Sequence, residues 1–411
     1  MPLIVSRIAE LAAPARLGGS FRRLMVSTWV TNLGDGMALA AGPLLVASQT
    51  RNPLLVAAAA FVQSLPLLLF GFQAGVIADR INRKLICIGA DLSRVALLAV
   101  LVGFITTGHV NIWVVLVVLF GLGTFETFAD TAGPALLPML VSSKDLGLAN
   151  SRLLTGYVTF NQLAGPPIGA FLFAAGLAWS FVAQAVLLVF GAGVLMRLVV
   201  PSQSRPEVAL TMRSEIRAGV TWLMNHPPVR TLALTIVTFN VAFGAPAAVM
   251  VLYAQDRLGL DSVGFGLLTS MSAIGGVIGT VAYPWLEQRV TLGTIMRVGL
   301  IWETLSHAAL ALTTTEWVAM AVFFVFGIHA FIWATTSTSI RQRAVPLELQ
   351  GRVGSTYRMG MYAGFLIGQV LGGVIASQWG ILAPFWFAFV ASAVLLVLIW
   401  RQLPKIAHIN D

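Results

Sequence analysis

Apolar stretches of about 20 residues recur along the whole chain, and they constrain its fold more than any other feature. Each is long enough to cross a hydrocarbon core of about 30 Å as an α-helix. Composition agrees, because 58% of the 411 residues are hydrophobic and only 10% are charged. The short alternating segments that build membrane β-barrels are not found in the sequence. We therefore expect an all-α integral membrane protein.

The chain contains twelve candidate membrane spans, and its basic residues orient them. The spans cover roughly 24–48, 54–78, 85–106, 112–139, 149–174, 178–200, 229–254, 263–285, 292–312, 317–341, 353–376 and 380–402. An even number puts both termini on one side, where 23 of the 25 Lys and Arg fall, leaving only Arg51 and Arg257 opposite. The positive-inside rule then predicts cytoplasmic termini and a multi-pass protein of the cell inner (plasma) membrane. The net charge of +9 is thus a topology signal, with lipid attraction secondary, and predicts no nucleic-acid partner.

The two halves of the chain echo each other at an offset of 208 residues, which pairs Asn32 with Asn240 and Gly36 with Gly244. A duplicated six-span bundle is typical of secondary transporters. Within the polar centre of the chain, Met212 to Asn225 is predicted to be a helix on the cytoplasmic face. The expected parts are an N-terminal segment 1–23, a six-helix bundle 24–200, a central loop 201–228, a second six-helix bundle 229–403 and a tail 404–411.

A charged segment between the second and third spans carries a family resemblance. Gly75-Val-Ile-Ala-Asp79-Arg80-Ile-Asn-Arg83-Lys84 resembles the signature loop of the major facilitator superfamily, and the twelve spans and the repeat agree. The resemblance implies two six-helix bundles working by alternating access, with this loop as a cytoplasmic latch between them. The alternative is that its bases only set topology. The expected latch residues are Gly75, Asp79, Arg80, Arg83, Lys84, Asp91, Arg94 and Arg352.

A finer resemblance points to one branch of that superfamily. Asn32-Leu-Gly-Asp35-Gly36, Asp91-Leu-Ser-Arg94 and Ala149-Asn150-Ser-Arg152 are similar to motifs of its multidrug, macrolide and enterobactin exporters. This resemblance implies transport out of the cell.

Acids within the predicted spans are the sharpest functional signal, because a charge at the bilayer centre costs at least ~2.5 kcal/mol. Asp35 lies eleven residues into the first span, about 16–17 Å deep at 1.5 Å per residue. We expect it to bind protons or substrate; the alternative is a structural acid bonded to Asn32 or to a neighbouring helix. Glu126 and Asp130 share one face of the fourth span and are candidates for proton coupling. Asp130 could instead join the latch network with Arg80 or Arg94.

Histidines provide further candidates. His329 is predicted to line a cavity, either as a satisfied neutral side chain or as a titrating one. Glu303 and His307, four residues apart, are expected to form a structural pair. No Lys or Arg is expected at mid-membrane depth, which favours neutral or cationic amphiphiles over anions as cargo.

Aromatic and small residues complete the expected site. The candidates for cavity lining, each of which could instead serve packing, are Asn32, Phe125, Phe128, Asn161, Phe239, Asn240, Phe243 and Trp333. Proline kinks a helix and glycine permits close approach. A bendable interface between the halves, or ordinary small-residue packing, is therefore expected at Gly165, Pro166, Pro167, Gly169, Gly372 and Gly373.

These features predict a proton-coupled antiporter that exports amphipathic, neutral or cationic organic compounds as a monomer. Its partners would be the substrate, protons and membrane lipid. One alternative is a dedicated siderophore or metabolite exporter of the same fold; another is a membrane sensor or assembly partner that transports nothing. The sequence shows no metal cluster, no phosphate-binding glycine loop and no nucleophile motif, so we expect neither an enzyme nor a cofactor.

Overall fold

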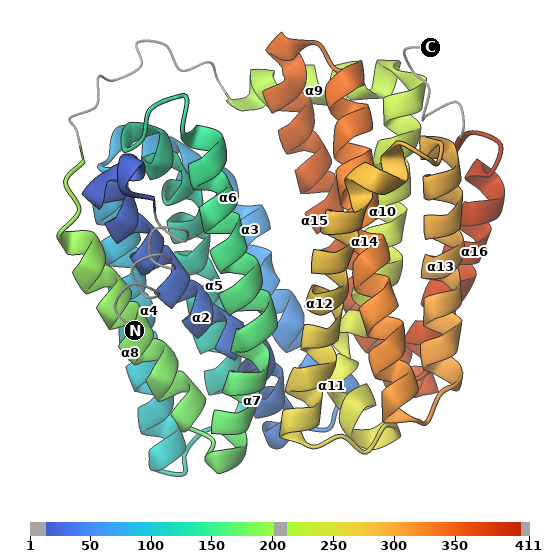
Figure 1. Ribbon diagram of the computed structural model, residues 1–411. Coiled ribbons are helices and arrows are strands. Elements are labelled where there is room, and N and C mark those ends of the chain that lie inside the picture. The colour runs from blue at the N-terminus through green and yellow to red at the C-terminus, as the bar shows by residue number, and fades with distance from the viewer. Residues whose placement is uncertain (1–13, 201–211, 404–411) are drawn as a thin grey trace, which may run out of the picture. The chain divides into compact units, whose positions relative to one another are not determined.

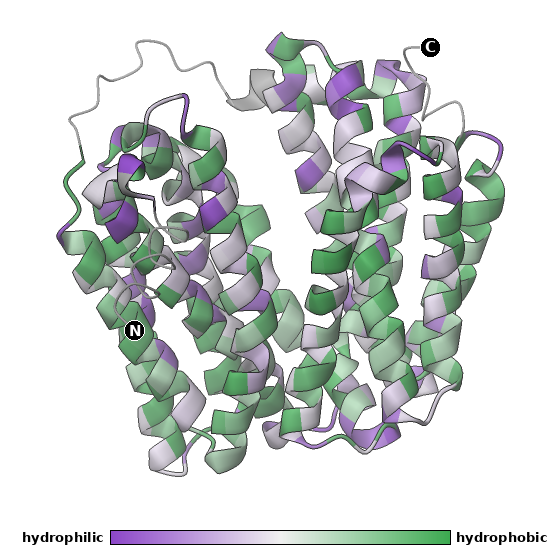
Figure 2. Cartoon of the chain, viewed as in Figure 1, coloured by the Kyte–Doolittle hydropathy of each residue, from purple (hydrophilic) through white to green (hydrophobic). Residues whose placement is uncertain are grey.

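The computed structural model describes residues 14–200 and 212–403, and every regular element in these ranges is a helix (Figure 1). Ten of the described helices are long and apolar enough to cross a membrane. They are α2 (Gly18–Gln49), α3 (Pro53–Arg80), α4 (Arg83–Thr106), α5 (Ile112–Ala132), α8 (Trp179–Met196), α10 (Pro227–Ala248), α12 (Ser262–Glu287), α13 (Leu292–Leu312), α14 (Glu316–Ala344) and α15 (Gln350–Trp379). Figure 2 shows hydrophobic residues along these helices and hydrophilic ones mainly toward their ends.

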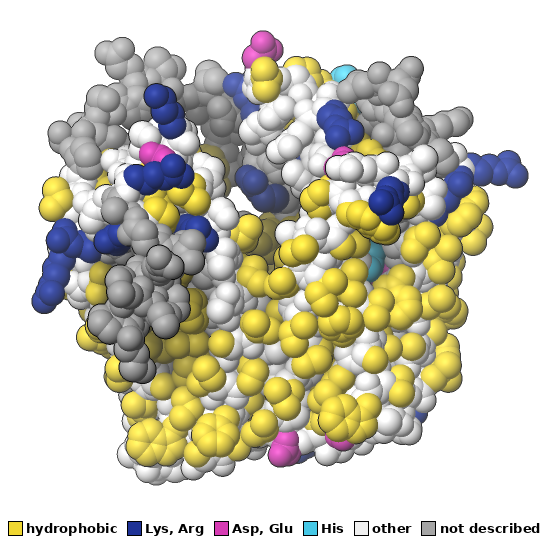
Figure 3. All heavy atoms as spheres, in the orientation of Figure 1, with side chains coloured by type: hydrophobic (Ala, Val, Ile, Leu, Met, Phe, Trp, Pro, Cys, Tyr) yellow, Lys and Arg dark blue, Asp and Glu magenta, His cyan; other side chains and the backbone are white. Residues whose placement is uncertain are grey.

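Two further segments complete the twelve predicted spans. The last is α16 (Ala383–Ile399), a shorter helix of 17 residues. The fifth is a continuous path through α6 (Leu146–Gly156), the π-helical segment η3 (Tyr157–Ala164) and α7 (Gly165–Ala175). Much of the surface along the helices is hydrophobic in Figure 3, as expected where side chains face lipid. The all-α, twelve-span fold class is therefore confirmed.

Helix ends follow the sequence-based boundaries closely, with three larger differences. Helix α2 begins at Gly18 rather than at residue 24, and α5 ends at Ala132 rather than at residue 139. Helix α10 is followed by a short α11 (Met250–Leu252) and a π-helical turn η4 (Tyr253–Arg257). The predicted helix in the central connection is α9 (Met212–Asn225). The tail 404–411, much of segment 1–23 and part of loop 201–228 lie outside the described residues.

The chain forms two compact units. Unit 1 comprises Met1–Gln49, Val62–Pro206 and Ser262–Ser270, and unit 2 comprises Thr50–Phe61, Glu207–Asp261 and Met271–Asp411. The first residues of α3 thus group with unit 2, and the first residues of α12 group with unit 1. The division at residues 200 and 229 stays a prediction.

The same helix pairs pack together in both units, which gives the internal repeat a physical basis. In unit 1, α2 packs on α7 and α8, and α4 packs on α5 and α8. In unit 2, α10 packs on α15 and α16, and α13 packs on α14 and α16. Close approach needs glycine at matching places: a Cβ on Gly36 would lie 2.3 Å from the Asn161 carbonyl oxygen, and one on Gly244 would lie 2.4 Å from that of Phe365.

The predicted hinge residues serve this same packing. A Cβ on Gly165 would lie 2.5 Å from the Cα of Gly36, and one on Gly169 would lie 2.2 Å from the Met37 carbonyl oxygen. Gly372 meets Ala245 of α10 in the same way. Gly373 approaches Ala57, and the Pro166–Pro167 backbone approaches Gly266. Small-residue packing therefore accounts for Gly165, Gly169 and Gly372, and a bending role stays a prediction.

Candidate functional site

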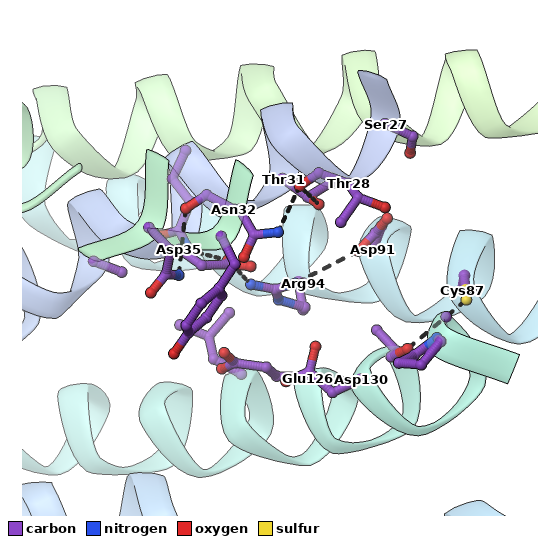
Figure 4. Close-up of a pocket in the computed structure, with 18 of the residues that line it drawn as sticks. Ser27, Thr28, Thr31, Asn32, Asp35, Cys87, Asp91, Arg94, Glu126 and Asp130 are labelled. Carbon is purple, nitrogen blue, oxygen red and sulfur yellow. Dashed lines mark hydrogen bonds and ion pairs between the residues drawn. The ribbon is translucent and has the colours of Figure 1, made fainter. Parts of the chain in front are cut away.

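A cavity of about 600 Å³ opens inside unit 1. Residues from α2, α4, α5, η3 and α8 line it, joined by residues of α3, α6 and the short 3-10 helix η2 (Pro134–Met139), so distant parts of the chain converge on one space (Figure 4). The ionisable side chains along its wall, apart from Cys87 and Tyr157, are Asp35, Asp91, Arg94, Glu126 and Asp130. The cavity therefore concentrates charge in a protein that has little of it.

Arg94 is the centre of this charge cluster. It lies midway along α4, a helix of 24 residues, and its side chain is only 3% exposed. One guanidinium nitrogen donates to Asp35 on α2, and Nη1 lies 3.5 Å from the Oδ1 of Asp91. Asp91 and Arg94 share a face of α4 because they are three residues apart. Arg94 thus compensates two buried acids on two helices.

Polar neighbours fix the position of Asp35. The Nε2 of Gln184 on α8 lies 3.4 Å from Asp35 Oδ1 and donates to it. Asn32 donates instead to the Thr28 carbonyl, and Asn161 donates to the Asn32 carbonyl at 3.3 Å. The partners of the Asp35 carboxylate are therefore Arg94 on α4 and Gln184 on α8. Of the two contacts that the structural alternative allowed, the bond to neighbouring helices is formed and the bond to Asn32 is not.

Glu126 and Asp130 lie one turn apart on α5 and both line the cavity (Figure 4). Glu126 is half-buried and interacts electrostatically with Asp35 and Arg94. Neither acid forms a salt bridge within the part of the chain that the structure describes, because the guanidinium of Arg94 is already occupied by Asp35 and Asp91. Asp130 therefore does not join Arg80 or Arg94 in an ion pair.

The position of Arg94 contradicts one prediction from the sequence and differs from another. The prediction that no Lys or Arg lies deep in a span is wrong, because Arg94 is buried in the middle of α4. Asp91 and Arg94 were expected at the latch, whereas they line the cavity with Asp35. Hydropathy places arginine at helix ends because an unpaired charge is costly in lipid. Two acids remove that penalty here, and only the folded structure brings Asp35 to the pair.

Arg83 and Lys84 of the signature loop form bonds within unit 1. Helix α3 continues to Arg80, α4 begins at Arg83, and Arg83 pairs with the largely exposed Asp79 at 3.2 Å. Lys84 Nζ donates to the Met196 and Leu198 carbonyls at the end of α8, where a cation complements the helix dipole. Arg80 is exposed, and no atom lies within 4 Å of a Cβ built on Gly75. The latch role stays a prediction.

The remaining predicted residues lie elsewhere. Phe125 and Phe128 are on α5 but are not among the residues that line the cavity. In unit 2, Phe239 stacks on Trp333 with ring centroids 6.5 Å apart, and both rings contact His329. Three other predicted residues, Asn240, Phe243 and Arg352, also lie in unit 2. Asn240 donates to the Ile236 carbonyl, Phe243 stacks on Phe326 and Phe365, and the Arg352 carbonyl approaches Gly219 of α9.

Sequence reasoning missed Gln184, Tyr157 and Gln162 as cavity residues. Gln184 had a usable signal, since it is the one amide in the apolar run of α8. Tyr157 and Gln162 bond to each other at 3.1 Å along η3. A π-helical turn shifts the face that each residue presents, so the ordinary helical period does not assign them to the cavity.

Comparison with known proteins identifies the family. The family model described as "Transmembrane secretion effector" matches residues 10–410. The chain is 25% identical to the multidrug efflux pump Tap of Mycolicibacterium fortuitum, over 95% of this chain and 97% of that protein. It is 24% identical to macrolide efflux protein A of Streptococcus pyogenes, over 88% and 89% of the two chains. It is 27% identical to the multidrug resistance protein MdtG of Proteus mirabilis, over 76% and 77%.

Solved structures agree on the fold. A bacterial homologue of the iron transporter ferroportin, in its inward-facing state, matches with a TM-score of 0.73 and 18% identity, over 94% of this chain and 98% of that one. The nucleoside transporter NupG matches with a TM-score of 0.71 and 11% identity, over 95% and 99%. The chain belongs to the transmembrane secretion effector family of major facilitator superfamily transporters and is a distant relative of multidrug and macrolide efflux proteins.

Proposed function

We propose that this protein is a proton-coupled antiporter that exports amphipathic cationic or neutral organic compounds by alternating access. The observation that carries the proposal is the acid-rich cavity of unit 1. A volume of about 600 Å³ lies within the range of small-molecule sites. The names of the relatives, multidrug and macrolide efflux proteins, support export of organic molecules of this size.

The charge balance of the cavity favours cations. Four acids and one arginine line it, so the wall carries a formal charge of −3 when all five are ionised. Apolar side chains such as Leu119, Leu122 and Phe181 lie beside them and would contact the body of an amphiphile. An anionic siderophore would be repelled by the same wall, so the metabolite-exporter alternative has less support.

Protons and cationic cargo compete for the same charges in this scheme. A proton on Asp35 removes one of the two acids that Arg94 compensates, which lowers the negative charge of the cavity by one. A cationic substrate is favoured when that proton leaves, because the cavity then regains its charge. Glu126 can contribute in the same way, since it interacts electrostatically with both Asp35 and Arg94. Exchange of one for the other across the membrane is antiport.

The test is efflux from proteoliposomes under an imposed pH gradient, with ethidium as the cationic probe. The wild-type protein should move ethidium against its gradient only while the pH gradient lasts. Asp35→Asn should abolish this uphill transport and retain ethidium exchange between the two sides, since exchange needs no net proton movement. Glu348→Gln, at an exposed acid outside the cavity, is the matched control and should behave as wild type.

Two results would contradict the proposal. Ethidium efflux at the same rate without a pH gradient would show that transport is not coupled to protons. Full uphill transport by Asp35→Asn would show that Asp35 is not needed for the coupling. A protein that binds ethidium but moves none under any gradient would instead be a sensor or assembly partner.

A further inference from the structure

A second cluster of ionisable groups is buried in unit 2, apart from the acid-rich cavity. Glu303 lies in the middle of α13 and its side chain is 0% exposed. The Nε2 of His307, one turn later, is 3.0 Å from Glu303 Oε1. The Nε2 of His329, on α14, is 3.7 Å from Glu303 Oε2. Each carboxylate oxygen therefore faces a different imidazole.

No other charged group shares this environment among the described residues that pack around it. Helix α16, which packs on α13, has no ionisable side chain between Ala383 and Ile399. On α14 the other ionisable residues lie at its two ends, and Arg297 on α13 turns away to the ring and carbonyl of Trp400. On α10, Arg230 lies at the helix start and bonds to the Met224 carbonyl. Helix α12 packs on α14, and its one charged residue, Glu287, lies at the helix end and pairs with Arg343. Arg257 bonds to the Leu312 and Thr313 carbonyls at the end of α13. Only the two imidazoles can compensate Glu303.

The pocket around His329 is shaped to hold its ring. A Cβ on Gly299, one turn before Glu303, would lie 2.8 Å from that imidazole, so the ring rests directly against the α13 backbone. Phe239, Phe326 and Trp333 each present an edge-to-face contact, with ring centroids 6.2–6.5 Å from that of His329. The imidazole is thus kept beside the carboxylate and away from lipid.

Several polar atoms of this cluster have no hydrogen-bond partner among the described residues. They are Glu303 Oε2, His307 Nδ1 and His329 Nε2, and the indole Nε1 of Trp302 and Trp333 are also buried without such partners in unit 2. A carboxylate with two neutral imidazoles would leave one net negative charge in this buried site. Effective penalties for an uncompensated buried ion are several kcal/mol. One added proton cancels the charge, whichever of the three groups carries it.

We propose that Glu303, His307 and His329 form a proton-binding site of unit 2 that holds one exchangeable proton. Uptake forms one N–H or O–H bond and release breaks the same bond, with no electron transfer. Its use in transport rests on the proposed antiport, whereas the binding of the proton does not. Unit 2 would then carry a proton site of its own, separate from the acid-rich cavity that Asp35 lines in unit 1.

The direct test counts protons in the wild-type protein. Solid-state NMR of isotope-labelled histidine in lipid resolves the five histidines of the chain, and His307→Gln and His329→Gln assign their signals. Infrared spectroscopy with a Glu303→Gln reference detects the acid or carboxylate form of Glu303. The expected result is one proton beyond a carboxylate with two neutral imidazoles, found either as one imidazolium or as a carboxylic acid. Exposed His109 and His226 serve as internal references.

The Glu303→Gln variant tests whether the proton is bound because of the carboxylate. Glu303→Gln removes the charge that requires the proton, so both imidazoles should be neutral in this variant, whichever group carries the proton in wild type, while His109 and His226 are unchanged. Uphill ethidium efflux should fall about tenfold or more, and ethidium exchange should stay within about twofold of wild type. His307→Gln should keep the proton count, because His329 and Glu303 can still share the proton.

Two outcomes would overturn the inference. One is an ionised Glu303 with two neutral imidazoles in the wild type, a measurement that needs no variant to fold. The other is an imidazolium at His307 or His329 that persists in Glu303→Gln. The two proposals can fail separately. Ethidium efflux that does not depend on a pH gradient would refute the antiport, but it would not change the number of protons measured at Glu303, His307 and His329.

Discussion

Replacing Arg94 with methionine tests the charge cluster of unit 1 most directly. Methionine keeps an unbranched side chain that reaches about as far as the arginine Nε, and it removes the charge. Arg94 is 3% exposed, and its partners Asp35 and Asp91 are 16% and 7% exposed. At the 3.5 Å separation of Arg94 and Asp91, the attraction is about 5 kcal/mol for an effective dielectric constant of about 20. Loss of one partner from a buried ion pair typically costs about 3–5 kcal/mol.

The loss should appear as a lower melting temperature. For a unit of this size, each kcal/mol corresponds to about 2–4 °C, so Arg94→Met should melt about 10 °C below wild type. The deficit should be largest at alkaline pH and shrink as the pH falls, because bound protons remove the uncompensated negative charge. The melting temperature of Arg94→Lys should lie between those of Arg94→Met and wild type, since one ammonium cannot place two separate nitrogens on Asp35 and Asp91.

The chain carries its own reporter for this assay. Cys87 is its only cysteine and is buried on α4, so a thiol-reactive fluorophore reports when this helix comes apart on heating. Arg80→Met is the matched control: Arg80 is exposed and has no ion pair among the described residues, so its loss should change stability by no more than about 0.5 kcal/mol.

A second pair of variants separates the ion pair from general damage. Asp35→Asn in the Arg94→Met background removes one uncompensated acid and should recover part of the lost stability, so the two changes should not add. Equal melting temperatures for Arg94→Met, Arg80→Met and wild type would refute the reasoning. Strict additivity of Asp35→Asn and Arg94→Met would refute the specific pairing.

Two further predictions concern the signature loop and the helix packing. Asp79→Ala should leave ethidium binding intact and slow its turnover in proteoliposomes, as expected of a latch; unchanged turnover would contradict that role. Gly169→Ala should lower the melting temperature by the equivalent of about 1–3 kcal/mol, because its Cβ would overlap the Met37 carbonyl oxygen. Gly75→Ala, with no atom within 4 Å of the added methyl, should keep or raise stability, and equal losses at both glycines would rule out the packing explanation.

The helices themselves were predictable because lipid imposes one solution on an apolar run. Backbone groups in hydrocarbon must bond within their own segment, so apolar length sets the span. The central helix Met212–Asn225 was predictable for a different reason, since its polar residues recur with a helical period. Apolar length alone does not predict the path through η3, because a π-helical turn changes the face that each residue presents.

The candidate site was predictable only one helix at a time. Spacing of three or four residues found Glu126 with Asp130 and Glu303 with His307, because these neighbours share a helical face. It could not find Arg94 with Asp35, or His329 with Glu303, because each pair joins two helices whose relative rotation is set by packing. Gly36 against Asn161 and Gly299 against His329 are such packing contacts, and they fix which side chains meet.

The two units solve the problem of a buried acid in different ways on the same helical frame. In unit 1 the compensating group is a permanent cation, Arg94, which donates to Asp35 beside a large cavity. In unit 2 the groups beside Glu303 are imidazoles, which are cations only when protonated, and the inference above assigns them and Glu303 one shared proton. Phe243, which stands where the repeat would place a counterpart of Asp35, stacks on Phe326 and Phe365 instead. The two units therefore share the packing of their helices and differ in their ionisable groups, and the proposals above assign the exchange of cargo for protons to unit 1 and the holding of one proton to unit 2.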